Sequence, residues 1–306
     1  MTRASEIYSL GRAAGGDERN LTLRNAQSEQ PGLYVVATPI GNAQDVTLRA
    51  LQVLRTCDVI VAEDTRITAK LLAIHGISKP LSPYNDHNAA RERPRLLARL
   101  QDDQRVALVS DAGTPLISDP GYKLVREALA GKVGVYAIPG PSAVLTALTL
   151  AGLPTGRFMF VGFLPSKAGA RRRALEDVRS VPATLVFFES PRRLAECLQD
   201  MAAILGNREA AVCRELTKLH EEIRRADLDF LASEFQAGAP PKGEITVVVG
   251  APKATGPDFH KAEMLLVKAL AHMPVNAAAD LVAAACDLPK RAMYERALAL
   301  KNDDEA

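Results

Sequence analysis

Three short apolar segments of this chain each run into a loop rich in glycine and proline and then into a helical pattern. The clearest loop, SDAGTPLISDPG over 110–121, follows Val106–Val109, and the others follow Leu33–Ala37 and Val133–Ile138. In an open α/β sheet, loops at the carboxyl ends of strands border the crevice where ligands bind. Three stiff loops of this kind predict one preformed pocket for a small molecule. The alternative is that glycine and proline only mark turns, which explains one loop better than three.

Common nucleotide, hydrolase and metal motifs do not accompany these loops. The chain has no G-x-G-x-x-G after a strand, no G-x-x-x-x-G-K-[ST] and no G-x-S-x-G. Its 4 cysteines and 5 histidines are scattered, without C-x-x-C or H-E-x-x-H. The sequence therefore argues against ordinary dinucleotide, P-loop and serine-hydrolase chemistry and predicts no metal site.

The order of apolar segments predicts two α/β domains followed by a helical appendage. At 306 residues the chain has the length of about two domains. Its cores must be mainly aliphatic, because Trp is absent and aromatic residues make up 5%. A breaker-rich hinge is expected at Gly152–Gly156. The predicted parts are a mobile tail over 1–30, an N-terminal α/β domain with a parallel sheet over 31–152, a C-terminal α/β domain over 153–252 and the appendage over 253–306.

Hydrophobic periodicity places the elements of these parts. Strands are predicted over 33–38, 57–62, 106–109, 133–138, 158–163, 184–188, 209–214 and 244–249. Helices are predicted over 47–55, 65–75, 89–100, 171–178 and 192–205. Three further helices are predicted in the appendage, over 259–272, 276–285 and 289–301.

Two interpretations of the appendage stay open. A helix-turn-helix-like unit would offer basic and aromatic side chains of its last helix to phosphate or base, and a small helical cap would serve packing or dimerisation. Under the first interpretation the contacting residues are Lys290, Arg291, Tyr294 and Arg296.

The charge and hydropathy of the chain limit its partners. A net charge of +2 is too balanced for nucleic-acid binding through overall charge, so an anionic partner would have to meet local basic clusters. Each cluster alone can also be a solvated helix face. No apolar run is long enough for a signal peptide or a transmembrane helix, which predicts a soluble, cytoplasmic protein without a membrane partner.

Seven motifs, taken in order, resemble the tetrapyrrole methylase superfamily over about 33–250. They are TPIGNAQDVTLRA, VAEDTRITAKLL, SDAGTPLISDPG, IPGPSA, FFESPRR, ELTK and PKGEI. Within that superfamily, EDTR, SDAGTPLISDPG and FFESPRR resemble the bacterial branch that methylates a ribose 2′-oxygen of a cytidine in 16S ribosomal RNA. The resemblance implies two α/β domains with a cofactor cleft between them and S-adenosylmethionine as cofactor. It also implies a cytidine near the decoding centre as target, in the small ribosomal subunit or its assembly intermediate, and a homodimer.

The resemblance also implies a set of cofactor-binding positions. Glycine at 113 allows the backbone to approach a ligand closely, and the hydroxyls of Thr114 and Ser142 can donate hydrogen bonds. Each position alone is also compatible with plain core or turn. The implied set is Pro39, Gly41, Asp111, Gly113, Thr114, Pro115, Ser118, Ser142, Ala143, Phe188, Leu216 and Gly243.

Methyl transfer to a ribose hydroxyl requires alignment of the attacking oxygen and removal of its proton. The proton-acceptor candidates are Glu63, Glu189 and Glu215, and the candidates for contact with RNA phosphate are Arg66, Arg192 and Lys242. The segments that contain Glu63 and Glu189 each follow a predicted strand, and their alternative role is helix capping. Asp64 and Ser190 would then be N-caps, and Pro191 would take the first helical position.

Two other functions remain open on the sequence. The same fold can methylate a porphyrin or corrin ring, or a modified amino acid. A ligand-sensing nucleic-acid-binding regulator would bind its ligand without turnover, whereas a methyltransferase must consume its cofactor.

Overall fold

The computed structural model describes residues 30–117, 121–252, 259–286 and 288–304. The chain divides into two compact units between Ala143 and Val144. Helix α5 (Ala143–Ala151) is therefore grouped with the second unit, and the hinge expected at Gly152–Gly156 follows its end. Each unit is described below by itself.

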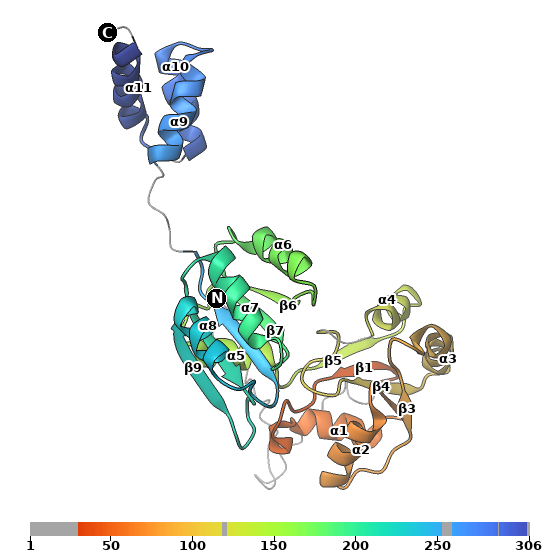
Figure 1. Cartoon of the computed structure of the whole chain (residues 1–306). Helices are drawn as coiled ribbons and strands as arrows, with labels where there is room; N and C mark the ends of the chain where they lie inside the picture. The colour runs from red at the N-terminus through yellow and green to blue at the C-terminus, as the bar shows by residue number, and fades with distance from the viewer. Residues whose placement is uncertain (1–29, 118–120, 253–258, 287, 305–306) are drawn as a thin grey trace, which may run out of the picture. The chain divides into compact units, whose positions relative to one another are not determined.

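The first unit carries a parallel sheet of five strands in the order β3-β2-β4-β1-β5 (Figure 1). The chain leaves β1 in the direction of β2 and leaves β4 in the opposite direction, toward β5. Connections therefore reverse between the neighbours β1 and β4, and ligands bind at such switch points, outside the carboxyl ends of the strands. The strands are β1 (Gly32–Val36), β2 (Val59–Ala62), β3 (Leu81–Pro83), β4 (Arg105–Val109) and β5 (Val135–Ile138).

Successive side chains along these strands point to opposite faces of the sheet and fill two cores, one on each face. Tyr34 and Ile60 pack beneath α1 and α2, whereas their chain neighbours Leu33 and Val61 pack beneath α3 and α4. The near-continuous apolar strands predicted from the sequence follow from this double coverage. The helices are α1 (Leu48–Thr56), α2 (Thr65–Ile74), α3 (Ala89–Gln101) and α4 (Tyr122–Ala130).

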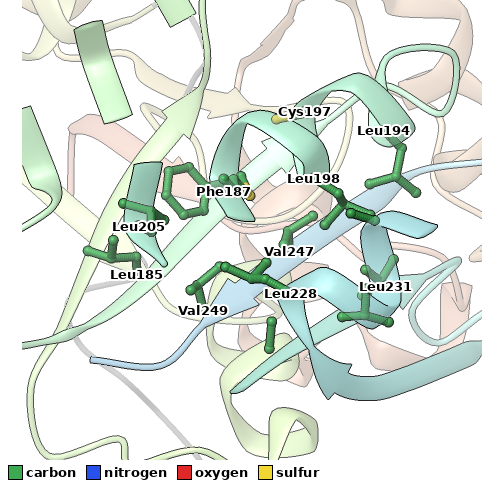
Figure 2. Packing of buried hydrophobic residues seen from close by; sticks show 14 of the residues in the cluster. Leu185, Phe187, Leu194, Cys197, Leu198, Leu205, Leu228, Leu231, Val247 and Val249 are labelled. Carbon is green, nitrogen blue, oxygen red and sulfur yellow. The ribbon is translucent and has the colours of Figure 1, made fainter. Parts of the chain in front are cut away.

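The second unit contains a mixed sheet of five strands in the order β6-β7-β10-β8-β9, in which the paired neighbours β6 and β7 are parallel and the other three neighbouring pairs are antiparallel. Figure 2 shows Phe187 and Val247 of this sheet packed against Leu198 of α7 and Leu228 of α8. The elements are β6 (Phe158–Phe163), α6 (Ala168–Val178), β7 (Thr184–Glu189), α7 (Leu194–Leu205), β8 (Glu209–Arg214), β9 (Glu222–Asp227), α8 (Leu228–Ala237) and β10 (Ile245–Val249).

The three helices predicted in the appendage are confirmed as α9 (Phe259–Leu270), α10 (Val275–Cys286) and α11 (Lys290–Asp304). They surround an apolar cluster whose members all lie within residues 262–300, including the fully buried Leu266 and Ala297. The appendage therefore has a core of its own.

Several elements differ from the prediction. Strands β3 and β9 and helix α8 were not predicted, because β3 is only three residues long and β9 reads EIRRAD, a charged sequence suited to an edge strand. Helix α7 begins at Leu194, so Ser190 is not its N-cap and Pro191 is not its first residue. Among the helices that the structure describes, none is both long and apolar enough to cross a bilayer.

Candidate functional site

The loops after β1 and β4 are joined by backbone pairing at the switch point of the first sheet. Thr38 N donates to Gly113 O at 2.9 Å, and Gly113 N donates to Thr38 O at 3.0 Å. Ser110 is buried beneath this bridge, where its Oγ donates to Gly113 O at 2.9 Å and its carbonyl oxygen accepts from Thr38 Oγ1 at 3.1 Å. The sequence had not singled out Ser110, although it opens the SDAGTP motif.

The loop after β5 joins the same assembly. Thr114 Oγ1 donates to Pro141 O at 3.2 Å, and Ala37 N donates to Ile138 O at 3.1 Å. The three glycine- and proline-containing loops therefore contact one another within the first unit, and the pocket expected at them stays a prediction.

Gly113 has a conformation that the bridge requires. Its φ is +78°, in the left-handed region that favours glycine. A Cβ atom at this position would lie 3.2 Å from Ile40 Cγ2 and 3.7 Å from Pro141 O. Any side chain here would press on the neighbouring loops, so Gly113 sets how closely the three loops approach one another.

A fourth loop, which follows β2, is hydrogen-bonded to the loop after β4 through the side chain of Asp111. Asp64 N donates to Asp111 Oδ1 at 2.9 Å. Asp64 is also the N-cap of α2, as predicted, because its Oδ1 accepts from Arg66 N at 2.9 Å. The Arg66 guanidinium turns back onto the same carboxylate, with Nη2 at 2.6 Å from Oδ2, and lowers the pKa of Asp64 to about 2. Arg66 therefore already has an acidic partner.

Glu63 and Asp111 lie at this edge with raised pKa values. Glu63 is an exposed residue, but its carboxyl group is partly desolvated, and this desolvation, together with the nearby carboxylates of Asp111, Asp86 and Asp64, raises its pKa. Burial raises the pKa of Asp111 despite the hydrogen bond from Asp64 N. A carboxylate with a raised pKa holds a proton more readily, which suits a group that accepts one during a reaction.

The remaining predicted positions of the first unit follow the same strands. Pro39 is half-buried and Gly41 exposed after β1, and Pro115 is buried after β4. Ser142 precedes α5, which begins at Ala143. Ser118 lies outside the described residues.

Glu189 of the second unit is sealed from solvent. Its side chain has an exposed fraction of 0%, its Oε1 accepts from Ser190 N at 2.7 Å, and its Oε2 lies 3.3 Å from Arg193 Nη2. A carboxylate in this position orders the turn between β7 and α7.

Glu215 is also held in a structural role. Its Oε1 accepts from Lys218 Nζ at 2.8 Å and from Glu244 N at 2.9 Å. Burial alone would raise the pKa of Glu215, but these two donors outweigh it and hold the pKa below its ordinary value. Gly243 makes room for this arrangement, because its φ is +99° and a Cβ atom there would lie 2.3 Å from Glu215 Cδ.

Other predicted positions of the second unit divide between core and surface. Leu216 is buried, whereas Arg192 and Lys242 are exposed. Phe188 is half-buried between two phenyl rings, with ring centroids 4.8 Å from that of Phe160 and 5.5 Å from that of Phe163. Phe163 was not singled out by the sequence, although it ends a strand directly before a basic loop.

The basic side chains predicted on α11 are paired inside the appendage. Lys290 Nζ lies 2.9 Å from Asp280 Oδ1, Arg291 Nε lies 3.0 Å from Glu295 Oε1, and Arg296 pairs with Glu263. Tyr294 is 39% exposed. Contact with phosphate would therefore have to replace intramolecular ion pairs.

The thiols and histidines do not assemble into a further centre in the described part of the chain. Cys57, Cys197 and Cys213 are buried and Cys286 is partly exposed, all as free thiols. No group of three or more His, Cys, Asp or Glu side chains among the described residues is placed to hold a metal ion.

Two sequence profiles match most of the chain. The family described as Tetrapyrrole (Corrin/Porphyrin) Methylases matches residues 32–232, and the RsmI C-terminal HTH domain matches residues 257–301. Ribosomal RNA small subunit methyltransferase I of Mesorhizobium japonicum is 50% identical over 278 residues, which cover 90% of this chain and 95% of that protein. The protein of the same name from Erythrobacter litoralis is 51% identical over 277 residues, covering 90% and 98%.

Solved structures show the same fold at low identity. Diphthine synthase matches with a TM-score of 0.57 and 19% identity, over 71% of this chain and 89% of that one. Uroporphyrin-III C-methyl transferase from Thermus thermophilus, complexed with S-adenyl homocysteine, matches with a TM-score of 0.51 and 20% identity, over 71% and 96%.

Proposed function

Because this chain belongs to the tetrapyrrole (corrin/porphyrin) methylase family, we propose that it is an S-adenosylmethionine-dependent methyltransferase that modifies a cytidine ribose of 16S ribosomal RNA. The observation that carries the proposal is the match to the ribosomal RNA methyltransferases named above, which extends over 95% or more of their length. The EDTR, SDAGTPLISDPG and FFESPRR motifs support the 2′-oxygen of a cytidine near the decoding centre as the methylated atom.

The joined loops of the first unit fit the proposed cofactor chemically. S-adenosylmethionine supplies a transferable methyl group on a sulfonium, and it carries an ammonium and a carboxylate besides. Asp111 provides negative charge for the cationic groups, Gly113 permits close backbone approach, and the start of α5 at Ala143 favours an anion. The proposed holding residues of the first unit are Pro39, Gly41, Asp111, Gly113, Thr114, Pro115, Ser142 and Ala143. In the second unit Phe188, Leu216 and Gly243 stay positions that the family resemblance implies.

Among the three proton-acceptor candidates, Glu63 is the one whose surroundings suit the role. It is exposed at the carboxyl end of β2, and its pKa is raised, so its carboxylate accepts a proton more readily than an ordinary glutamate. Glu189 is sealed inside the second unit, and the Glu215 carboxylate is bound by Lys218 and Glu244 N. We therefore propose that Glu63 removes the proton from the ribose hydroxyl.

The RNA contacts are proposed at exposed basic residues. Arg192 and Lys242 are exposed, whereas Arg66 and the basic residues of α11 would exchange a carboxylate partner for a phosphate. The substrate is the small ribosomal subunit or its assembly intermediate, and the protein acts as a homodimer in the cytoplasm.

Methyl transfer from labelled S-adenosylmethionine tests this function. Small subunits from a strain that lacks the gene are incubated with the purified protein, and the RNA is digested to nucleosides. The proposal expects label in 2′-O-methylcytidine and stoichiometric release of S-adenosylhomocysteine. A parallel incubation contains a porphyrin or corrin acceptor in place of the small subunits. Label only in that acceptor, or cofactor binding without turnover, would contradict the proposal and favour one of the two alternative functions.

A further inference from the structure

Strand β6 presents its phenylalanines on one face of the second sheet because of a β-bulge. Its register with β7 shifts between Phe160 and Gly162. In a regular strand, residues at odd separation point to opposite faces, so Phe160 and Phe163 would be separated by the sheet. The bulge adds one residue and brings Phe163 opposite Phe188, to the same face as Phe160.

Phe163 is an exposed ring on a fixed support. Its side chain is 59% exposed, whereas Phe188, which it contacts at a centroid distance of 5.5 Å and an interplanar angle of 60°, is half-buried and contacts Phe160 on its other side. The adjacent Phe187 points to the opposite face and into the main core (Figure 2). Phe163 is therefore held at the surface without being part of that core.

Basic side chains follow the two strands at this edge. Strands β6 and β7 are parallel, so their carboxyl ends meet at the same edge of the sheet. The loops after them are tied together, because Arg193 Nη2 donates to Leu164 O at 2.8 Å and to Pro165 O at 3.1 Å. Lys167 and Arg192, one in each of these segments, are exposed, and residues 163–174 include no Asp or Glu. An exposed ring is thus combined with local positive charge.

We propose that Phe163 is a stacking platform for an unpaired nucleobase of the RNA substrate, with Lys167 and Arg192 contacting the flanking phosphates. The inference rests on the proposed function and deepens it by assigning an aromatic RNA contact to the second unit. Single-stranded RNA combines planar apolar groups with regularly spaced negative charge, and both features of this edge match that combination. An apolar peptide would use the ring alone, and a free phosphate would use the cations alone.

The substitution Phe163→Leu tests the platform, with Phe230→Leu as the matched control. Leucine keeps an apolar side chain but removes the ring face, and Phe230 is an equally exposed phenylalanine, at 61%, on α8 of the same unit. In the full-length protein, Phe163→Leu should raise the Kd for an unpaired fragment of 16S rRNA about tenfold, and Phe163→Trp should restore it. Phe230→Leu should leave the Kd unchanged, and neither variant should change the Kd for S-adenosylmethionine.

Three results would overturn the inference. The first is an unchanged RNA affinity in a folded Phe163→Leu variant. The second is a loss confined to S-adenosylmethionine affinity, which would make Phe163 a cofactor contact. The third is a change of oligomeric state without a change in RNA affinity per protomer, which would make this edge an interface between two copies. If the wild-type protein methylates rRNA and any of these results is found, this inference fails alone; if the wild type does not methylate rRNA, the proposed function fails with it.

Discussion

At the scale of single residues, the first unit depends on Gly113 and the second on Gly243, each for a different reason. Gly113 holds the left-handed conformation from which the bridge to Thr38 is made. Gly243 leaves space for the Glu215 carboxylate, which the sequence had assigned to proton transfer. The motif containing Gly113 could be recognised from sequence, but the acceptance by Glu215 of a hydrogen bond from Glu244 N could not, because that contact spans 29 residues.

Replacing Gly113 by alanine should weaken cofactor binding more than it destabilises the fold. The left-handed backbone costs a non-glycine residue about 1 kcal/mol, and the new methyl group would press on Ile40 Cγ2 at 3.2 Å. Gly76→Ala is the control, because its φ of +63° is also in the left-handed region and a Cβ atom there would lie in open space. Calorimetry should show at least about a tenfold loss of S-adenosylmethionine affinity for Gly113→Ala only. Equal affinities for the two variants would remove this loop from the cofactor site.

The proposed role of Glu63 predicts a pH dependence. Only the deprotonated carboxylate accepts a proton, so kcat falls as the pH falls through the pKa of Glu63. Because that pKa is raised, the acid limb should lie above the range of an ordinary glutamate. Asp86→Asn removes one of the negative charges that raise the pKa and should move the limb to lower pH. Glu63→Gln should lower kcat at least about a hundredfold with an unchanged Kd for the cofactor; a variant that keeps wild-type kcat and pH profile would exclude Glu63 as the base.

At the scale of elements, α6 and α7 are joined by a nearly buried ion-pair cluster. Arg171 Nε donates to Asp200 Oδ2 at 2.6 Å, and Arg172 Nε donates to Asp200 Oδ1 at 2.8 Å. The side chains of Arg171 and Asp200 are only 4% and 7% exposed. Burial alone would raise the pKa of Asp200, but the two guanidinium groups outweigh it and hold the pKa below its ordinary value.

The substitution Asp200→Asn should therefore destabilise the second unit by about 3 kcal/mol, because it leaves the buried Arg171 guanidinium with only a longer ion pair, 3.6 Å from Glu196 Oε2. The exposed pair of Glu176 and Arg179 gives the control, and Glu176→Gln should change the free energy of unfolding by about 0.5 kcal/mol or less. Since the pKa of Asp200 is lowered on folding, its contribution should be present above the unfolded-state pKa and lost as the pH falls through the folded-state pKa. Urea titrations at several pH values measure these effects. Equal destabilisation by the two substitutions would refute this account of the cluster.

The elements that the sequence predicted are those with a strong local signal. Buried parallel strands read as apolar runs, and Asp64 could be identified as a cap because an N-cap acts within three residues. Strand β9 is polar and pairs only with β8 at the sheet edge, so its strand character comes from tertiary pairing. The burial of Glu189 and the bulge in β6 were missed for the same reason, since the face on which a residue lies depends on the register with a neighbouring strand.

At the scale of the whole molecule, the appendage is a separable module. The apolar cluster of the appendage is formed within residues 262–300 and shares no residue with the core clusters of the two sheets. Its basic side chains on α11 are paired with acids, which lowers the number of phosphates that it can bind without breaking an ion pair.

Removal of residues 253–306 should leave S-adenosylmethionine affinity unchanged and weaken binding to 16S rRNA. The slope of log Kd against log salt should become shallower by about the number of RNA phosphates that the appendage binds in the full-length protein. Filter binding at several salt concentrations measures both the affinity and the slope. If the truncated protein binds rRNA as tightly as the full chain but is a monomer where the full chain is a dimer, the appendage serves dimerisation and not RNA docking.

The most direct test of the central claim is methyl transfer to an RNA that lacks one oxygen. Assembled small-subunit RNA is prepared with a 2′-deoxy sugar at the acceptor cytidine, beside an otherwise identical RNA with the 2′-hydroxyl, and both are incubated with the protein and labelled S-adenosylmethionine. The account predicts one methyl group per hydroxyl-bearing RNA and none on the deoxy RNA. Equal methylation of the deoxy RNA would show that a base atom is the acceptor and would contradict ribose 2′-O-methylation.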